Sequence, residues 1–263
     1  MDRSFPIVLI TGSGTGIGAA AARIFGGGGA AVGVVGRRIE PLENTAAQIE
    51  AAGGKALVIP ADLADPAAPH LIVSKVAEKW GGLDVIVNNA AAIHHLPVAE
   101  ATREWFDRHM AVNVRAPYFL VQEGLPYLKE SAAPCVINIS SSSGSLAIPG
   151  QSMYGCSKAA LEYLTRSLAA ELAPWSIRVN AIAPGPVDTP IHLTWAGDDL
   201  EGAYERMKKE VPLQRMGTAE ELGEWIVWLA GPQSRFVTGA VIPVDGGQVL
   251  PGALSAISGE QDG

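Results

Sequence analysis

An apolar run that ends in a glycine-rich turn constrains the fold of this chain more than any other feature. Residues 6–11 (PIVLIT) are apolar and rich in β-branched side chains, which predicts a short strand buried on both faces. The turn TGSGTGIG follows at 11–18, and the alanine-rich segment behind it is typical of a helix. Glycines between a strand and a helix let the backbone approach a pyrophosphate, which the N–H groups of the helix N-terminus can bind. We therefore expect a dinucleotide at this turn, contacted by Gly12, Ser13, Thr15, Gly16, Ile17 and Gly18.

Six further apolar runs predict the rest of a sheet. They cover 30–36, 56–60, 83–87, 135–139, 177–182 and 237–244, and helical patterns at 41–53, 66–80, 102–129, 154–172 and 218–229 lie between them. Buried strands that alternate with helices are typical of a parallel sheet with helices on both faces. The sequence thus predicts an α/β fold, in which residues 1–263 form a single Rossmann-like, doubly wound domain around a seven-stranded parallel sheet. We interpret 190–216 as a substrate lid and 248–263 as a C-terminal tail.

Residues with distinctive chemistry follow the predicted strands. Six strand ends carry one each: Gly12, Arg37, Asp62, Asn89, Ser141 and Pro184. In a doubly wound sheet, ligands bind in the crevice at the carboxyl ends of the strands. We therefore expect these residues to line one cleft.

The end of the second predicted strand bears on the choice of cofactor. In dinucleotide folds this position faces the adenosine ribose, where an acid suits NAD and an arginine suits the 2′-phosphate of NADP. The chain has Arg37 and Arg38 there, and an acid appears only at Glu40. Because the planar guanidinium pairs well with phosphate oxygens, we predict NADP(H), with NAD(H) as the alternative. Asp62, which precedes Leu63, could accept a hydrogen bond from the adenine amino group or cap the next turn.

A tyrosine and a lysine lie one helical turn apart in the predicted helix 154–172. The i, i+4 spacing places Tyr154 and Lys158 on one face of that helix. A nearby cation favours the phenolate and so lowers the tyrosine pKa, which lets the phenol exchange a proton with a substrate oxygen. Ser141, in the serine cluster that follows a predicted strand, could hold that oxygen in place.

Composition excludes several classes of function. The net charge of the 263 residues is −8 and no basic block is present, which argues against a nucleic-acid partner. No apolar run reaches the roughly 18 residues that a membrane span needs, and the N-terminus does not resemble a signal peptide. We therefore expect a cytoplasmic protein without a membrane partner. The two cysteines and five histidines show no metal-ligand spacing, so we expect neither a metal site nor a disulfide framework.

Taken together, the motifs closely resemble those of the short-chain dehydrogenase/reductase family, in its common one-domain form, over residues 6–247. The marks are TGxxxGxG at 11–18, NNA at 88–90, Asn113, Ser141, YxxxK at 154–158 and PG at 184–185. The resemblance implies that Tyr154 is the general acid/base and that Lys158 lowers its pKa and holds the nicotinamide ribose. It also implies that Ser141 positions the substrate oxygen and that Asn113 holds a water in a proton relay. Further cofactor contacts are implied for Asn89, Ala90, Pro184, Gly185, Val187 and Thr189.

The implied reaction is hydride transfer between nicotinamide and a ketone or secondary alcohol. A carbonyl reductase that acts on ketones or hydroxyketones is the favoured interpretation, while a 3-oxoacyl thioester reductase and a sugar or polyol dehydrogenase are alternatives. A catalytically silent dinucleotide-binding sensor or scaffold is a different class. Ile93, Met153 and Trp195, with Ser141, are expected to line a partly hydrophobic substrate pocket. Family members are usually homotetramers, with the last strand and its neighbouring helices in the interfaces.

Two positions depart from the family pattern. The family usually has NNAG, whereas this chain has Ala91 in the fourth position, and alanine would be strained if that position needed a positive φ. The run Gly26–Gly29 replaces residues that are usually charged. We expect it to loosen the turn before the second strand, away from the cleft.

Overall fold

The computed structural model describes residues 5–191 and 199–250, and its centre is one seven-stranded parallel sheet. The strands are β1 (Ile7–Thr11), β2 (Ala31–Gly36), β3 (Lys55–Pro60), β4 (Val85–Asn88), β5 (Cys135–Ile139), β6 (Arg178–Pro184) and β9 (Val241–Val244). Their order across the sheet is β3-β2-β1-β4-β5-β6-β9, and every neighbouring pair is parallel. The strand order reverses between β1 and β4, which is where a doubly wound sheet forms its ligand crevice. The predicted α/β fold is confirmed.

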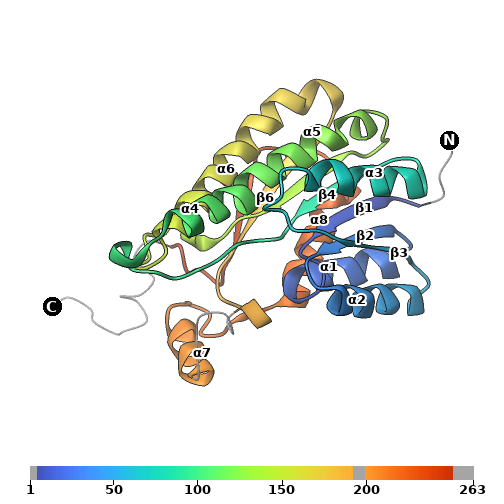
Figure 1. The fold of residues 1–263 in the computed structure, drawn as a ribbon. Coiled ribbons are helices and arrows are strands. Elements are labelled where there is room, and N and C mark those ends of the chain that lie inside the picture. Colours follow the sequence, from blue (N-terminus) through green and yellow to red (C-terminus); the bar gives the residue numbers. More distant parts are fainter. Residues whose placement is uncertain (1–4, 192–198, 251–263) are drawn as a thin grey trace.

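Helices cover both faces of the sheet (Figure 1). One layer consists of α1 (Gly16–Gly27), α2 (Ile39–Ala51) and α8 (Ala219–Ala230), and the other of α3 (Ala68–Trp80), α4 (Arg103–Met110), α5 (Ala116–Lys129) and α6 (Ser152–Leu172). Successive side chains of a strand point to opposite faces of the sheet, so β1 packs against both helical layers. Its Ile7 and Leu9 join the core under α3, α5 and α6, while Val8 and Ile10 join the core under α1, α2 and α8.

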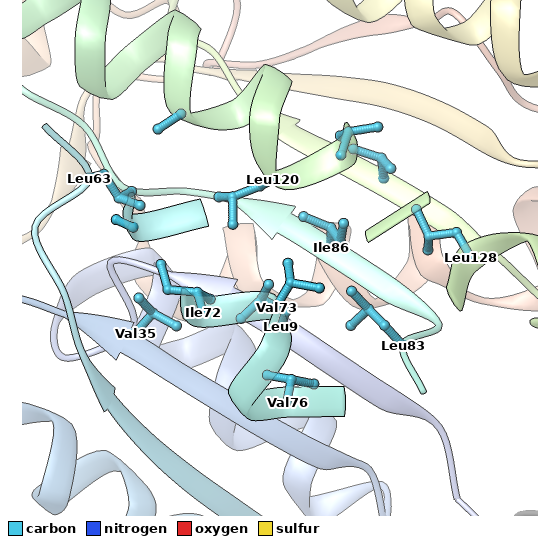
Figure 2. Packing of buried hydrophobic residues seen from close by; sticks show 14 of the residues in the cluster. Leu9, Val35, Leu63, Ile72, Val73, Val76, Leu83, Ile86, Leu120 and Leu128 are labelled. Carbon is cyan, nitrogen blue, oxygen red and sulfur yellow. The ribbon is translucent and has the colours of Figure 1, made fainter. Parts of the chain in front are cut away.

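The core under α3 and α5 holds this side of the cleft rigid. Figure 2 shows Ile72, Ile86 and Leu120 packed together beside Leu9, and all four side chains are fully buried. They come from α3, β4, α5 and β1, so one cluster fixes the position of two strands that end at the cleft.

The predicted helix 102–129 is divided in the structure. A π-helical turn, Ala111–Arg115, separates α4 from α5. Pro117 follows this turn directly and has no backbone N–H to donate to the carbonyl of residue 113, so a proline that we expected to bend or divide the helix does lie at the division. Pro117 lies in the first turn of α5, and Pro126 lies inside α5 without ending it. π-Helical turns of this kind are frequent at functional sites, and this one carries Asn113.

The last strand is shorter than the predicted 237–244. The side chain of Asn180 on β6 takes the backbone groups that a longer strand would use, because its Nδ2 donates to the carbonyl of Val237 at 2.8 Å and its Oδ1 accepts from the N–H of Ala240 at 3.1 Å. Gly239 between them has a φ of 74°, so the chain turns there. β9 therefore begins only at Val241.

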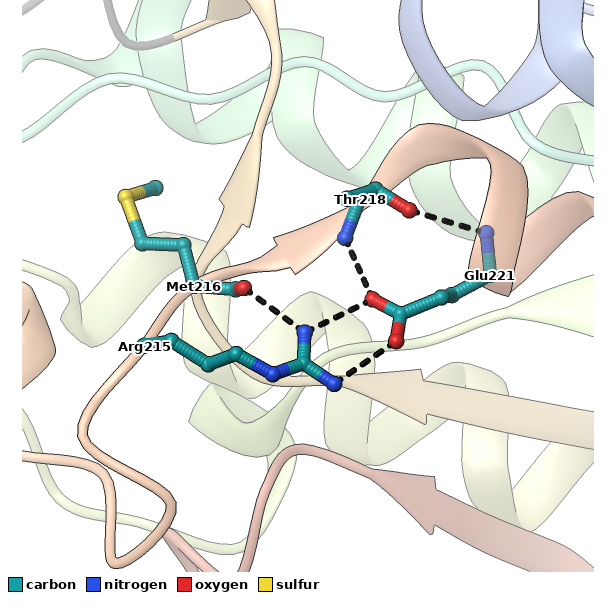
Figure 3. Close-up of polar contacts among 4 residues, drawn as sticks. All are labelled: Arg215, Met216, Thr218 and Glu221. Atoms are coloured by element: carbon teal, nitrogen blue, oxygen red, sulfur yellow. Dashed lines mark hydrogen bonds and ion pairs between the residues drawn. The ribbon is translucent and has the colours of Figure 1, made fainter.

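The segment that we interpret as a lid is anchored at both ends. β7 (Val187–Asp188) pairs in parallel with β8 (Gly217–Thr218), and α7 (Leu200–Lys209) lies between them in the sequence and apart from the main sheet (Figure 1). Figure 3 shows that Arg215 pairs with Glu221 through its two terminal guanidinium nitrogens and that Thr218 and Glu221 cap α8 reciprocally. The hydrogen bonds from Arg215, with those from Thr218, outweigh burial and lower the pKa of Glu221 to about 2. Residues 192–198, which include Trp195, lie outside the described residues.

The two departures from the family pattern have simple structural outcomes. Ala91 does not adopt a positive φ, so alanine is not strained there. Gly26 is buried in α1, and a Cβ on it would lie 2.5 Å from Cγ2 of Ile49 in α2. The glycine at this position is therefore needed for close helix packing, which the prediction of a merely looser turn missed. Among the described helices, none has both the length and the apolar content that crossing a membrane requires.

Candidate active site

The glycine-rich turn between β1 and α1 has no room for side chains. Gly12 and Gly16 have φ values of 67° and 56°, which residues with a Cβ rarely adopt. A Cβ on Gly12 would lie 2.8 Å from Cα of Ala90, and one on Gly18 would lie 2.4 Å from Nδ2 of Asn89. Glycine is therefore required at both positions, where β1, α1 and the end of β4 lie in close contact.

The start of α1 leaves its backbone donors for a ligand. Thr15 is the N-cap residue, and its side chain makes no capping hydrogen bond. The first N–H groups of a helix have no partner within the helix, and together with the helix dipole they favour an anion. Ile17 is partly buried and packs on the core under α1. The bare glycine turn and the uncapped helix start therefore fit the pyrophosphate of a dinucleotide.

Thr11 and Asn89 brace the turn by reciprocal hydrogen bonds. The hydroxyl of Thr11 accepts from the N–H groups of Asn89 and Ala90 at 3.0 and 3.1 Å. In return, Nδ2 of Asn89 donates to the carbonyls of Thr11 and Gly12 at 2.9 and 3.1 Å. The amide of Asn89 thus fixes the backbone of the turn. Sequence reasoning missed the bracing role of Thr11, although this residue begins the glycine motif.

Ser13 also has a structural role. It is fully buried, its hydroxyl donates to the carbonyl of Ile10 at 2.9 Å, and it accepts from the N–H of Val35 at 2.8 Å. The hydroxyl contact to the cofactor that we expected from Ser13 is therefore not supported. The same hydrogen bonds tie the end of β1 to β2.

Two arginines follow β2 at the rim of the cleft. Arg37 and Arg38 are both exposed. Arg37 lies close enough to Asp62 for its charge to help lower the pKa of that carboxyl group. A cationic group therefore stands at the strand end where dinucleotide folds place the adenosine ribose.

Asp62 is engaged by neighbouring protein groups. Its Oδ1 accepts from the N–H of Ala64 at 3.0 Å, and Arg108 on α4 pairs with its Oδ2 at 3.2 Å. Burial acts to raise the pKa of Asp62, but the Ala64 and Arg108 hydrogen bonds outweigh it, and the pKa lies below the usual value. The capping interpretation of Asp62 is confirmed. The side chain of Leu63 lies in the core under α3.

The chain beyond β6 returns to the glycine turn. Pro184 ends β6, and the N–H of Gly185 donates to a carbonyl of β9 at 3.2 Å. Val187 and Thr189 are buried just after it. A Cβ on Gly16 would lie 3.2 Å from the methyl group of Thr189, so this segment closes over the start of α1.

Ser141, Tyr154 and Lys158 come together at the ends of β5 and α6. Nζ of Lys158 lies 5.6 Å from the centroid of the Tyr154 ring and donates to the carbonyl of Ile139 at 2.7 Å. Ser141 lies close enough to Tyr154 for its hydroxyl to act on the pKa of the phenol. The hydroxyl of Ser141 also accepts from the N–H of Ser143 at 3.1 Å, which orients it at the end of the strand. A phenol, an amine and a hydroxyl thus share one buried site.

Burial is the largest effect on the pKa values of Tyr154 and Lys158. It raises the pKa of Tyr154 to about 12, while the hydrogen bond from Ser141 acts in the opposite direction. Burial also lowers the pKa of Lys158 to about 7, against the attraction of the Glu162 carboxylate. The predicted lowering of the tyrosine pKa by Lys158 is therefore wrong for this structure. Loss of hydration is the larger effect on both groups.

Asn113 holds the π-helical turn against the loop behind β4. Its Oδ1 accepts from the N–H of Ala92 at 2.7 Å, and its Nδ2 donates to the carbonyl of Ala92 and to Oγ of Ser157, both at 2.9 Å. Ser157 in turn donates to the carbonyl of Tyr154 at 2.7 Å. These bonds explain why a buried asparagine is tolerated within a helical segment, and they link it to α6.

Two polar residues of this site were not predicted. Ser157 precedes the lysine of YxxxK and connects Asn113 to α6. Glu162 is buried one turn after Lys158, and its carboxylate accepts from the hydroxyl of Ser140 at 2.8 Å. The i, i+4 spacing from Lys158 was a signal that could have indicated Glu162.

The expected substrate residues lie at different depths. Met153 is buried beside Tyr154 in the sequence of α6, Ile93 is partly exposed in the loop after β4, and Trp195 is outside the described residues. Within the described ranges, no cluster of three or more His, Cys, Asp or Glu side chains could hold a metal ion.

The chain is similar to known proteins over almost its whole length. A family model described as enoyl-(acyl carrier protein) reductase matches residues 12–248. An uncharacterized oxidoreductase of Thermotoga maritima is 37% identical over 92% of this chain and 96% of its own length. The 3-oxoacyl-[acyl-carrier-protein] reductase FabG of the same organism is 34% identical over 93% of this chain and 98% of its own length. A solved structure of LugOII has a TM-score of 0.86 at 35% identity, and the match covers 93% of this chain and 98% of LugOII. LugOII is described as a promiscuous reductase that catalyses keto-reduction at C1 during lugdunomycin biosynthesis.

These matches agree with the order of the motifs and with the fold. The chain belongs to the short-chain dehydrogenase/reductase family. It is an oxidoreductase of the type that uses a nicotinamide dinucleotide and acts on a small molecule.

Proposed function

We propose that this protein is a carbonyl reductase that transfers a hydride between NADP(H) and a ketone or secondary alcohol. The observation that carries the proposal is the convergence of Ser141, Tyr154 and Lys158 after β5, in the same parallel sheet in which β1 ends at a glycine turn that fits a pyrophosphate. When bound, the nicotinamide would supply or accept the hydride. The side chains of the protein position the substrate and supply the proton.

Tyr154 acts as the general acid in the direction of reduction. With a pKa of about 12, its phenol carries a proton at neutral pH and can donate it to a carbonyl oxygen as negative charge develops there. The hydroxyl of Ser141 stabilises the same oxygen. Lys158 would hold a ribose hydroxyl of the bound cofactor, and it can return a proton to the phenol because its own pKa of about 7 lets it exchange protons near neutrality.

Asn113 is the fourth residue of the proposed catalytic group, and it is linked to α6, the helix that carries Tyr154 and Lys158. Its side chain ties the π-helical turn to α6 through Ser157, and we keep the proposal that this residue holds a water in a proton relay to the lysine. Asn89, Ala90, Pro184, Gly185, Val187 and Thr189 remain our proposed cofactor contacts, by backbone or side chain. The approach of Thr189 to Gly16 supports this set.

NADP(H) is preferred because Arg37 and Arg38 are exposed at the end of β2. A 2′-phosphate could pair with either guanidinium group, whereas the ribose hydroxyls of NAD need an acid that this strand end lacks. NAD(H) remains the alternative cofactor.

A 3-oxoacyl thioester reductase is the second candidate function. Its support is the similarity to a protein named 3-oxoacyl-[acyl-carrier-protein] reductase. An acidic carrier would dock on a basic patch, and no basic block stands out in this acidic chain of net charge −8. A sugar or polyol dehydrogenase and a catalytically silent dinucleotide-binding protein are weaker candidates, and the complete Asn-Ser-Tyr-Lys set argues against the silent one.

The test is a spectrophotometric screen of NADPH and NADH against ketones, hydroxyketones, sugars and a 3-oxoacyl thioester. We expect ketone-dependent loss of NADPH absorbance. Tyr154→Phe should lower kcat at least about 100-fold, the scale of general-acid catalysis, while NADPH still binds in a fluorescence titration. Full activity of this variant would overturn the assignment of the general acid.

The family relation also supports an assembly of identical subunits. We propose a homotetramer in which β9 and the helices beside it form interfaces. The cytoplasmic location stays a prediction.

A further inference from the structure

His109 is a fully buried imidazole beside Tyr154 to which the proposed reaction gives no role. It lies on α4, and its ring centroid is 6.4 Å from that of Tyr154, with the rings edge to face at 69°. The ring of His109 also lies 6.2 Å from that of Trp105, on which the ring of His94 stacks at 4.1 Å and 9°. A row of four rings therefore reaches from the loop after β4 to the catalytic phenol.

The hydrogen bond of one ring nitrogen fixes the tautomer of His109. Its Nδ1 lies 2.6 Å from the carbonyl oxygen of Trp105. Because a carbonyl can only accept, Nδ1 carries the proton, and Nε2 of the neutral ring presents a lone pair. Burial lowers the pKa of His109, against the Trp105 hydrogen bond, and the nearby His94 lowers it further. His109 is therefore neutral at neutral pH.

The lone pair of Nε2 has no hydrogen-bond partner among the described residues. Buried polar atoms are nearly always paired, so an orphan in a native structure points to a group that arrives from outside the chain. That group must be a hydrogen-bond donor, because Nε2 can only accept. The carbonyl of a simple ketone cannot serve, whereas a hydroxyl can.

We propose that His109 binds a hydroxyl group of the substrate through Nε2, so that the preferred substrates are hydroxyketones in reduction and diols in oxidation. The inference rests on the proposed function, because Tyr154 and Ser141 are taken to hold the carbonyl oxygen. The hydroxyl is carried on a carbon close to that carbonyl, since the two rings are neighbours. A site that pairs a substrate hydroxyl also discriminates against the analogue that lacks it, because a buried acceptor is then left unpaired.

The experiment compares 2-hydroxycyclohexanone with cyclohexanone as substrates of the full chain with NADPH. We expect the wild type to favour the hydroxyketone by about tenfold or more in kcat/KM. His109→Phe keeps an aromatic ring beside Tyr154 but removes the acceptor, and it should lower this ratio about tenfold, toward one. His109→Gln keeps an acceptor oxygen and should retain part of the preference. His70→Phe is the matched control, since His70 is an exposed histidine on α3, and its ratio should equal that of the wild type.

The outcomes separate the two proposals. A wild type that reduces both ketones equally well overturns the role of His109 and leaves the carbonyl reductase standing, even if both variants fail to fold. A preference that survives in folded His109→Phe also overturns it. A merely structural role would lower kcat/KM for both substrates alike and leave their ratio unchanged, which counts against the proposal. A wild type that reduces neither ketone, and no other carbonyl of the screen, overturns both.

Discussion

At the scale of single residues, the burial of Lys158 is unfavourable for the fold. Its pKa falls from 10.5 to about 7, so between these values the unfolded chain binds a proton that the folded chain has released. Stability of the wild type therefore rises with pH in this window, by up to about 1.4 kcal/mol per pH unit. Below pH 7 the cost of the buried charge is fully present.

Replacing Lys158 by Met should remove this dependence, together with most of the activity. The variant lacks the buried charge, so its stability relative to the wild type should be highest near pH 6 and should decline as the pH rises toward 9.5. Thermal unfolding of both proteins across this range measures the difference. Lys75→Met, at an exposed position on α3, is the matched control. A difference that stays constant with pH would contradict the assignment of a lowered lysine pKa.

Arg37 is the residue that we expect to decide between the two cofactors. Its exposed guanidinium can form a charge-assisted pair with a 2′-phosphate, and losing such a pair costs about 1.5–3 kcal/mol. Arg37→Ala should therefore lower kcat/KM for NADPH about 10- to 100-fold and change that for NADH by less than about threefold. Arg235→Ala, an exposed arginine before β9, should change neither. Equal losses with both cofactors would argue for NAD(H) or for a purely structural arginine.

At the scale of elements, the π-helical turn is the feature whose stability depends on one side chain. Asn113 satisfies both backbone groups of Ala92 and the hydroxyl of Ser157. Asn113→Ala would leave these buried groups unpaired and should destabilise the fold by about 2–3 kcal/mol. For a chain of this size that is a fall in Tm of roughly 4–10 °C. Asn44→Ala on the exposed side of α2 should shift Tm by less than about 2 °C, because exposed positions contribute little. An unchanged Tm for Asn113→Ala would show that the turn does not depend on these bonds.

The elements that sequence reasoning predicted best are those with a strong local pattern. Continuous apolar runs such as 7–10 indicated buried strands because tertiary packing and local propensity agree there. Long-range hydrogen bonds decided the exceptions. The side chain of Asn180 shortened the last strand, and the bonds of Asn113 accompany the π-helical turn. Neither partner can be identified from sequence spacing alone.

The same distinction applies to the candidate site. The motif residues Ser141, Tyr154 and Lys158 meet as their spacing and the strand ends implied. The direction of the pKa shifts of Tyr154 and Lys158 could not be predicted from that spacing, because burial is a property of the whole fold and outweighs one neighbouring charge. His109 gave no signal in the sequence, since only the coordinates place it beside Tyr154.

At the scale of the whole molecule, exposed aromatic side chains lie on α8 and just before β9, in the elements where we propose the subunit interfaces. Trp225 and Trp228 pack edge to face on α8 at 5.7 Å and are each about 40% exposed, and Phe236, between α8 and β9, is fully exposed. We propose that these side chains take part in the subunit contacts.

Phe236→Glu should therefore weaken the assembly without unfolding the subunit. A fully exposed side chain contributes little to the fold, whereas a charge placed in an apolar interface must be desolvated without a partner. Light scattering coupled to size exclusion should show a tetramer for the wild type and smaller species for the variant, with equal circular dichroism. Val98→Glu, at another highly exposed apolar residue on the loop after β4, is the matched control and should remain tetrameric. A wild type that elutes as a monomer would refute the proposed assembly, and a Phe236→Glu tetramer would move the interface away from β9.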